Sequence, residues 1–269
     1  MQSALMNSLM LLSKAGNALE RILPTRTQGN WSKVPEVTAL FWVIKILSTG
    51  MGETGADYVD KKFNPIYPVT IAMIILALSL KWQFGKEKFV TATYWFAVVM
   101  VSVCGTMVAD ALHVALGVPY SISTPLFALA LSLIFAGWWI SEHTLSIHSI
   151  TSPRREMFYW LTVITTFALG TAAGDLTAVT LHMGYLSSGI MFAALFLIPG
   201  VLYKFRGLTE VTAFWTAYII TRPFGASFAD WMGVTKVRGG LDWGTGPVTI
   251  VLALIICILI WVSARKTPQ

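Results

Sequence analysis

The sequence predicts an all-α integral membrane protein of about eight transmembrane helices, arranged as four tandem two-helix repeats of the same orientation. The 269 residues are 55% hydrophobic and 12% charged, with a mean hydropathy of +0.68. Soluble domains carry about 25% charged residues. Apolar runs long enough to span a bilayer recur along the whole chain, so no part of it is expected to form a separate soluble domain.

One seventeen-residue pattern recurs four times without a gap. Each copy begins with an aromatic residue and Trp, has Gly ten residues after the Trp, and ends in Asp fifteen residues after it. The copies are FWVIKILSTGMGETGAD, YWFAVVMVSVCGTMVAD, YWLTVITTFALGTAAGD and FWTAYIITRPFGASFAD, ending at Asp57, Asp110, Asp175 and Asp230. At a rise of about 1.5 Å per residue, each aspartate lies roughly 22 Å from its Trp, inside the apolar layer.

A second apolar run follows each copy after a turn. These second helices are expected near residues 69–84, 121–140, 187–203 and 247–263. Two spans per repeat give every repeat the same orientation, so the repeats are related by an axis along the membrane normal. The membrane domain, 37–267, divides into repeats at about 37–88, 89–153, 154–208 and 209–267.

The first 36 residues differ from the rest. They lack an early basic region and a small-residue cleavage site, so they do not resemble a signal peptide. Scattered leucines with Lys14 and Glu20 between them, ending at Pro24, favour an amphipathic helix lying on the membrane surface. A tail without regular structure is an equal alternative.

The cations outside the expected spans predict the orientation. The N-terminal segment, the linkers between repeats and the C-terminus hold thirteen Lys and Arg residues, and the turns within repeats hold four. The positive-inside rule therefore puts both termini in the cytoplasm, with the repeat Trp residues near the cytoplasmic interface. Because the cations that make up the net charge of +6 are spread between apolar segments, we expect membrane lipid and not nucleic acid as a partner.

An aspartate inside the bilayer costs on the order of 3 kcal/mol even on lenient scales, so all four should face a protein interior or an aqueous cavity. They could simply tie neighbouring helices together. Polar residues at helical spacing favour a binding role, since they continue each aspartate's face inward. The candidate binding residues are Glu53, Asp57, Asp110, Asp175, Asp230, Thr49, Ser102, Thr106, Thr171 and His113.

Two embedded cations, Lys45 and Arg222, are expected to be counter-ions of this acidic cluster. Pro223 should kink the helix beside Arg222. The five embedded acids exceed the two bases by three, an excess that cations or protons must relieve. Carboxylate oxygens suit divalent metals, so the candidate metal ligands are Glu53, Asp57, Asp110, Asp175 and Asp230.

The leading functional prediction is a secondary transporter or exporter of a cation, most plausibly a divalent metal, coupled to protons or to the membrane potential. The metal would be substrate, and no cofactor is expected. A cation channel, a proton-coupled carrier of an organic cation, and a non-transporting receptor or assembly factor stay open. An enzyme is not expected, because four equivalent aspartates do not resemble a single catalytic pair. The sequence leaves the oligomeric state open.

The strings KVPEVTALFWVIKILSTGMGETGADY and FWTAYIITRPFGASFADW resemble the DUF347 family, also called uncharacterized membrane-anchored proteins. The resemblance runs from about Lys33 to the last helix. It implies a multi-pass protein of a bacterial inner membrane, with two membrane helices and a characteristic Trp in each repeat. It implies no activity.

Overall fold

The computed structural model describes residues 32–64 and 66–266, and it folds this part of the chain into eight α-helices and no strand. The first helix of each repeat is α2 (Ala39–Lys62), α4 (Thr91–Asp110), α6 (Pro153–Asp175) or α8 (Glu210–Gly233). The second is α3 (Ile66–Phe84), α5 (Tyr120–Glu142), α7 (Tyr185–Lys204) or α9 (Thr245–Lys266). The prediction of four two-helix repeats is confirmed. The expected surface helix falls almost entirely on residues 1–31, outside the described residues.

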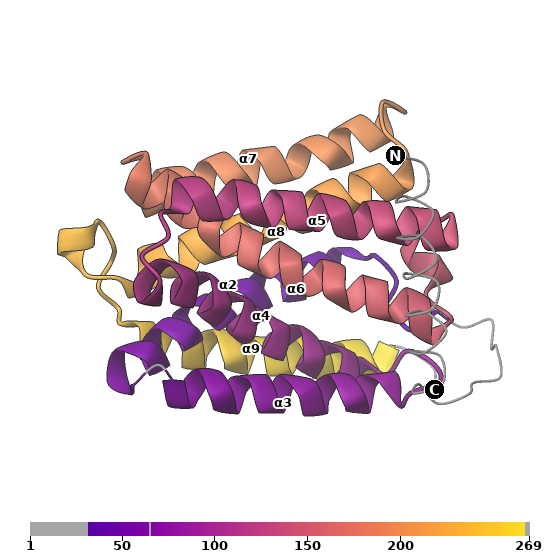
Figure 1. Cartoon of the computed structure of the whole chain (residues 1–269), viewed down its shortest axis with the longest axis horizontal. Coiled ribbons are helices and arrows are strands. Elements are labelled where there is room, and N and C mark those ends of the chain that lie inside the picture. The colour runs from indigo at the N-terminus through magenta and orange to yellow at the C-terminus, as the bar shows by residue number, and fades with distance from the viewer. Residues whose placement is uncertain (1–31, 65, 267–269) are drawn as a thin grey trace, which may run out of the picture.

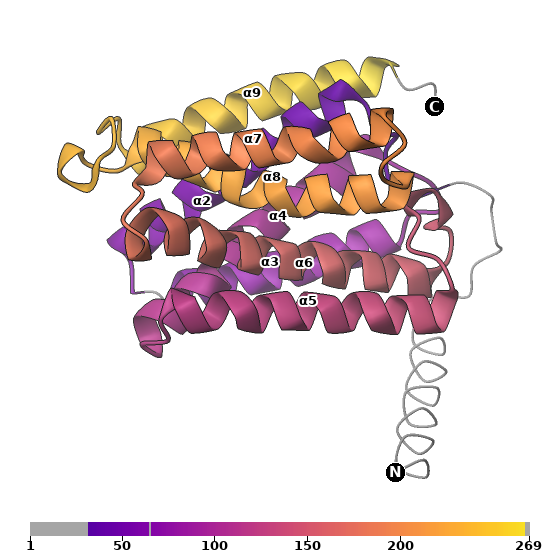
Figure 2. The same ribbon diagram turned by 90° about the horizontal axis from the view of Figure 1, so that it is seen from above.

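The eight helices lie side by side along the long axis of the molecule (Figure 1). The first helices form a closed inner ring, in which α2 contacts α4, α4 contacts α6, α6 contacts α8, and α8 contacts α2. Each second helix packs on the inner helix of the next repeat: α3 on α4, α5 on α6, and α7 on α8. The last helix, α9, packs on α2 and completes the ring, and Figure 2 shows α5 and α9 at opposite edges of the bundle.

Six of the helices are long and apolar enough to cross a membrane, which makes this a membrane protein. The other two long helices, α2 and α8, are each 24 residues, or about 36 Å. They fall short in hydropathy because they carry charged residues such as Lys45, Glu53 and Arg222, all of which are buried within the bundle. Pro223 lies inside α8, which is helical from Glu210 to Gly233.

The repeat glycines set the spacing of the inner ring. A Cβ atom on Gly52 would lie 1.9 Å from the Ser102 side chain, and one on Gly105 would lie 2.5 Å from that of Phe167. A Cβ atom on Gly170 would lie 2.0 Å from Arg222, and one on Gly225 would lie 2.8 Å from Thr49. Each of these four glycines therefore packs against the side chain eight residues before the aspartate of the next repeat. For Gly225, in the last repeat, that side chain is Thr49 of the first repeat.

Three of the four repeat Trp residues are buried within the bundle, and their position near the cytoplasmic interface stays a prediction. Trp95, Trp160 and Trp215 are 1%, 2% and 5% exposed. Each Trp packs on the aromatic ring that begins the pattern of the preceding repeat, with ring centroids 5.7–6.1 Å apart, a distance typical of buried aromatic pairs. Ring contacts of this kind hold the indoles inside the bundle, and Trp215 also donates to the Leu145 carbonyl at 2.9 Å.

Candidate functional site

Residues at equivalent positions in the four inner helices form rows across the bundle, one helical turn apart. We call the end of the bundle near the four repeat aspartates the aspartate end, and the end with the linkers 85–90, 143–152 and 205–209 the linker end. Four rows lie between the two ends and all their side chains are buried. From the linker end, the rows are Phe41, Tyr94, Tyr159 and Phe214; Lys45, Val98, Val163 and Tyr218; Thr49, Ser102, Phe167 and Arg222; and Glu53, Thr106, Thr171 and Ala226.

The fifth row consists of the four aspartates, and it borders a cavity of about 460 Å³ that we call the aspartate pocket. Asp57, Asp110, Asp175 and Asp230 all line this pocket, together with Glu53 from the row beneath. The structure therefore brings one carboxylate from each repeat to one cavity. Six polar side chains from outside the inner rows also line it: Asp60, Lys61, His113, Tyr120, Tyr185 and Arg238.

Arg222 closes the floor of the pocket. Its guanidinium donates to Glu53 Oε2 at 2.8 Å and to the backbone carbonyls of Thr49 and Phe167 at 2.9 and 3.2 Å. It also donates to the hydroxyls of Thr171, at 2.7 Å, and Thr106. A buried guanidinium needs hydrogen-bond partners, and this network supplies five acceptors from all three other repeats.

Lys45 differs from the expectation. It forms no ion pair with the aspartates, and its Nζ atom has no hydrogen-bond partner within the described residues. The ammonium instead lies 3.9 Å from the ring centroid of Phe167 and 4.3 Å from that of Tyr218. Three helical turns separate its row from the aspartate row, so the side chain meets aromatic faces before it can reach a carboxylate.

The smaller polar candidates divide between the pocket and the packing. Thr106 and Thr171 donate to Glu53 at 3.1 and 3.2 Å, directly beneath the aspartates. Thr49 and Ser102 lie one row deeper and bond to backbone carbonyls, so they do not reach the pocket. His113 lines the pocket, where its ring stacks on Tyr120 at 3.9 Å.

Sequence reasoning missed several pocket residues for which a signal was present. Asp60 and Lys61 follow Asp57 by three and four residues on the same helix face, and Lys61 pairs with Asp57. Tyr120 and Tyr185 each stand ten residues after the aspartate of their repeat, as does Tyr67 in the first repeat. Arg238, in the loop after α8, carries no periodic signal and reaches the pocket through a hydrogen bond to the Tyr185 hydroxyl.

Two of the aspartates are followed by an unusual backbone. Segments Ala111–Ala115 and Leu176–Thr180 are π-helical turns directly after Asp110 and Asp175. Such turns are rare and frequently occur at functional sites. The equivalent segment of the first repeat, 58–62, continues as α-helix, and α8 of the last repeat ends at Gly233, so the pocket has two kinds of wall.

The metal-site prediction finds no direct counterpart in this arrangement. Among residues 32–64 and 66–266, no three His, Cys, Asp or Glu side chains are grouped closely enough to hold one metal ion. The carboxylates are spread around the cavity wall. Glu142, near the second linker, pairs with Arg155 at 2.8 Å and with Arg154 at 3.4 Å.

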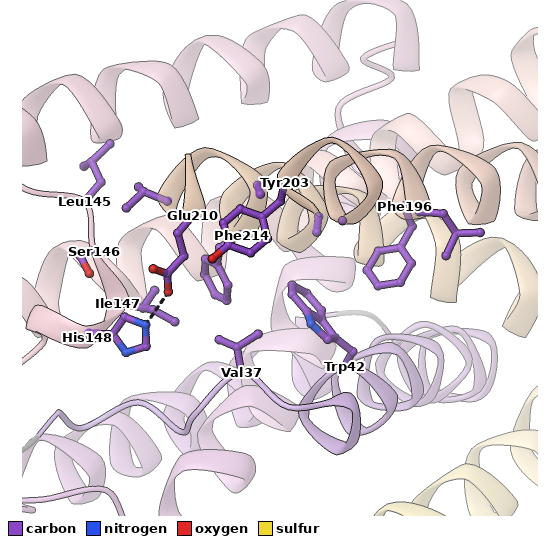
Figure 3. Close-up of a pocket in the computed structure, with 15 residues that line it drawn as sticks. Val37, Trp42, Leu145, Ser146, Ile147, His148, Phe196, Tyr203, Glu210 and Phe214 are labelled. Atoms are coloured by element: carbon purple, nitrogen blue, oxygen red, sulfur yellow. Dashed lines mark hydrogen bonds and ion pairs between the residues drawn. The ribbon is translucent and has the colours of Figure 1, made fainter. Parts of the chain in front are cut away.

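A second cavity, of about 400 Å³, lies between α2, α7, α8 and the linker before α6 (Figure 3). Apolar and aromatic side chains such as Trp42, Phe196 and Phe214 form most of its wall. Its ionisable side chains His148 and Glu210 lie 2.8 Å apart and are partners of each other. This crevice lacks the unpaired charge that distinguishes the aspartate pocket.

Fold and site together define a membrane protein of four tandem two-helix repeats, with an acidic cavity where the repeats converge. The family described as "Repeat of Unknown Function (DUF347)" matches residues 40–88, 93–144, 158–209 and 213–267. The chain belongs to this family. No curated protein and no solved structure matches the chain.

Proposed function

We propose that this protein is a secondary transporter of cations in a bacterial cytoplasmic membrane, with the aspartate pocket as its substrate site. The observation that carries the proposal is that one carboxylate from each repeat lines a single cavity whose floor is sealed by the Arg222–Glu53 pair. A carrier needs such a site, open at one end and closed at the other.

The closed side favours a carrier over a channel. Four buried rows fill the axis between the pocket and the linker end, and one of them is composed entirely of aromatic rings. A cation can cross these rows only if the inner helices rearrange, as in alternating access. The cavity itself favours transport over a receptor or assembly role, since a structural cluster needs no space for a ligand.

The charges in the pocket indicate how cation transport could be coupled to the movement of protons. Carboxylates that share a site share protons, so a cation entering the pocket displaces protons from it. We propose that a substrate bound by the aspartates weakens the Arg222–Glu53 pair, because it changes the field that acts on both groups. Separation of this pair would open the floor. The proposal includes no chemical reaction and no resident cofactor.

The orientation belongs to the proposal as well. The linker end carries cations in its linkers and in the adjoining helical turns, among them Lys81, Lys86, Arg154 and Arg155. The positive-inside rule places this end in the cytoplasm. The C-terminal end of α9 lies at that end (Figure 1). The aspartate pocket would then open outward.

The test uses the purified full chain in liposomes that contain a pH-sensitive dye. Mn²⁺, Mg²⁺, tetraethylammonium and 1,4-diaminobutane are added separately, with an imposed pH gradient or membrane potential. We expect saturable proton or charge movement with at least one cation, and its loss in Asp110→Asn and Asp230→Asn. Asp242→Asn is the matched control, because Asp242 is exposed in the loop after α8 and does not line the pocket. Absence of any flux, or full flux in both pocket variants, would refute the proposal.

A further inference from the structure

The aspartate pocket holds more negative than positive charge. Six carboxylates line it: Glu53, Asp57, Asp60, Asp110, Asp175 and Asp230. Three cations face them, namely Lys61 and Arg238 in the wall and Arg222 in the floor. Glu53 is paired with Arg222, and Asp57 with Lys61. The remaining four carboxylates form no ion pair with any described residue, and the pocket carries an excess of three negative charges when all its groups are ionised.

Asp230 is the most buried member of this group. Its residue is 7% exposed, and its carboxylate makes neither a hydrogen bond nor an ion pair within the described part of the chain. Its backbone carbonyl is used in capping α8, through Val234 N at 2.8 Å. A buried carboxylate without a partner is unfavourable, so a cationic group that enters the pocket gains most beside Asp230.

The spread of the carboxylates argues against a single metal ion as the preferred occupant. Calcium and magnesium are held by several oxygen ligands within about 2.0–2.6 Å of one point. No three acidic or imidazole side chains in the described residues are grouped in that way. Carboxylates around a cavity of about 460 Å³ are better matched by positive charges that are themselves separated. The volume lies within the range of about 300–1,000 Å³ found for organic ligands.

The rest of the wall suits an organic cation. Val69, Met107 and Val179 give it apolar patches between the acids. Tyr120 and Tyr185 add aromatic rings, and ammonium groups bind favourably to the faces of such rings. Methylene groups would contact the apolar patches while amino groups reach the acids.

We propose that the aspartate pocket binds an aliphatic diamine or polyamine, with two or more ammonium groups joined by short methylene chains. One ammonium group lies at Asp230 and a second reaches Asp110 or Asp175 on the π-helical side. This inference rests on the proposed function, since it names the substrate class of the same site.

Calorimetric titration of the purified full chain in detergent tests the proposal. The probes are 1,4-diaminobutane, spermidine, n-butylamine, Mg²⁺ and Mn²⁺. We expect the diamine and spermidine to bind at least ten-fold more tightly than butylamine, which carries one ammonium group on the same carbon chain. Both should also bind more tightly than either metal. Asp230→Asn should weaken diamine binding at least ten-fold, and Asp242→Asn should leave it unchanged.

A second variant guards against misfolding. Asp175→Asn, checked like Asp230→Asn for native helicity and a cooperative melt, should weaken the diamine and spermidine in the same direction. Equal affinity for butylamine and diaminobutane, or undiminished diamine binding in both variants, would overturn the inference. Binding of Mn²⁺ or Mg²⁺ without binding of the amines would overturn it and leave the proposed cation carrier intact. Binding of none of the five probes to folded protein, together with no flux in liposomes, would overturn both.

Discussion

The Arg222 guanidinium and the Glu53 carboxylate lie 2.8 Å apart, although 169 positions separate the two residues in the chain. Both side chains are buried, with exposed fractions of 0% and 4%. The pair joins the last repeat to the first, at the place where the inner ring closes. It therefore connects the closure of the fold with the closure of the pocket floor.

Breaking this pair from one side should destabilise the protein strongly. Arg222→Met leaves the Glu53 carboxylate buried with only two threonine hydroxyls, and removal of one partner from a buried ion pair costs about 3–5 kcal/mol. Thermal unfolding in detergent measures the loss. The double variant Glu53→Met/Arg222→Met should recover part of it, since it leaves no unpaired charge. A double variant as unstable as the sum of the two single variants would show that the two groups are not coupled.

Glycine substitutions in two helices should separate ring packing from general helix effects. A Cβ atom at Gly170 would lie 2.0 Å from the Arg222 side chain, so Gly170→Ala must displace Arg222 or separate α6 from α8. We expect a loss of about 1–3 kcal/mol in stability, typical of overpacking. Gly200→Ala in α7 is the control, because no atom of the described part of the chain lies within 4 Å of the added methyl group. If both variants unfold at the wild-type temperature, the close approach of α6 and α8 at Gly170 does not contribute to the stability of the protein.

The repeat made much of this architecture predictable, because Trp, Gly and Asp at fixed offsets define four equivalent helices. Equivalence alone does not say which neighbour each residue meets. Gly170 contacts Arg222, and Gly225 contacts Thr49, because of the direction in which the four inner helices follow one another around the ring. The burial of Trp95, Trp160 and Trp215 could not be predicted for a related reason. An indole in a membrane helix is stable both at the interface and inside an aromatic cluster, and only the position of the neighbouring helices decides between them.

The pocket was predictable in part as well. Its acids stand out because charge is rare in the bilayer. Tyr120 and Tyr185 stand at a fixed distance from their aspartates, a signal that the sequence carries. Arg238 lies in an irregular loop, whose path no periodic pattern describes.

Lys61 should act on ligand binding and not on stability. It pairs with Asp57 four residues earlier, and its side chain is 53% exposed. Exposed pairs of this kind contribute about 0.3–0.5 kcal/mol, so Lys61→Ala should unfold close to the wild-type temperature. The same change frees Asp57 and should raise the affinity for 1,4-diaminobutane several-fold in calorimetry. Lys62→Ala is the matched control, because Lys62 bonds to the Tyr58 hydroxyl and does not line the pocket. An equal gain in affinity in both variants would mean that the overall positive charge near the aspartate pocket, and not the pairing of Asp57, controls binding.

Lys45 gives the sharpest test of how the bundle tolerates charge. Its ammonium is fully buried between Phe167 and Tyr218, and residues 32–64 and 66–266 offer it neither a carboxylate nor a hydrogen-bond acceptor. Contacts with aromatic faces contribute about 2 kcal/mol when desolvated, less than the several kcal/mol needed to bury an ion. Lys45→Met keeps the length of the side chain and removes the charge, so it should stabilise the protein by about 1–3 kcal/mol against thermal unfolding. Ile44→Met, at the adjacent buried position, controls for the change in packing. If Lys45→Met lost more stability than Ile44→Met, the contacts of the ammonium with the aromatic faces would contribute more free energy than its burial costs.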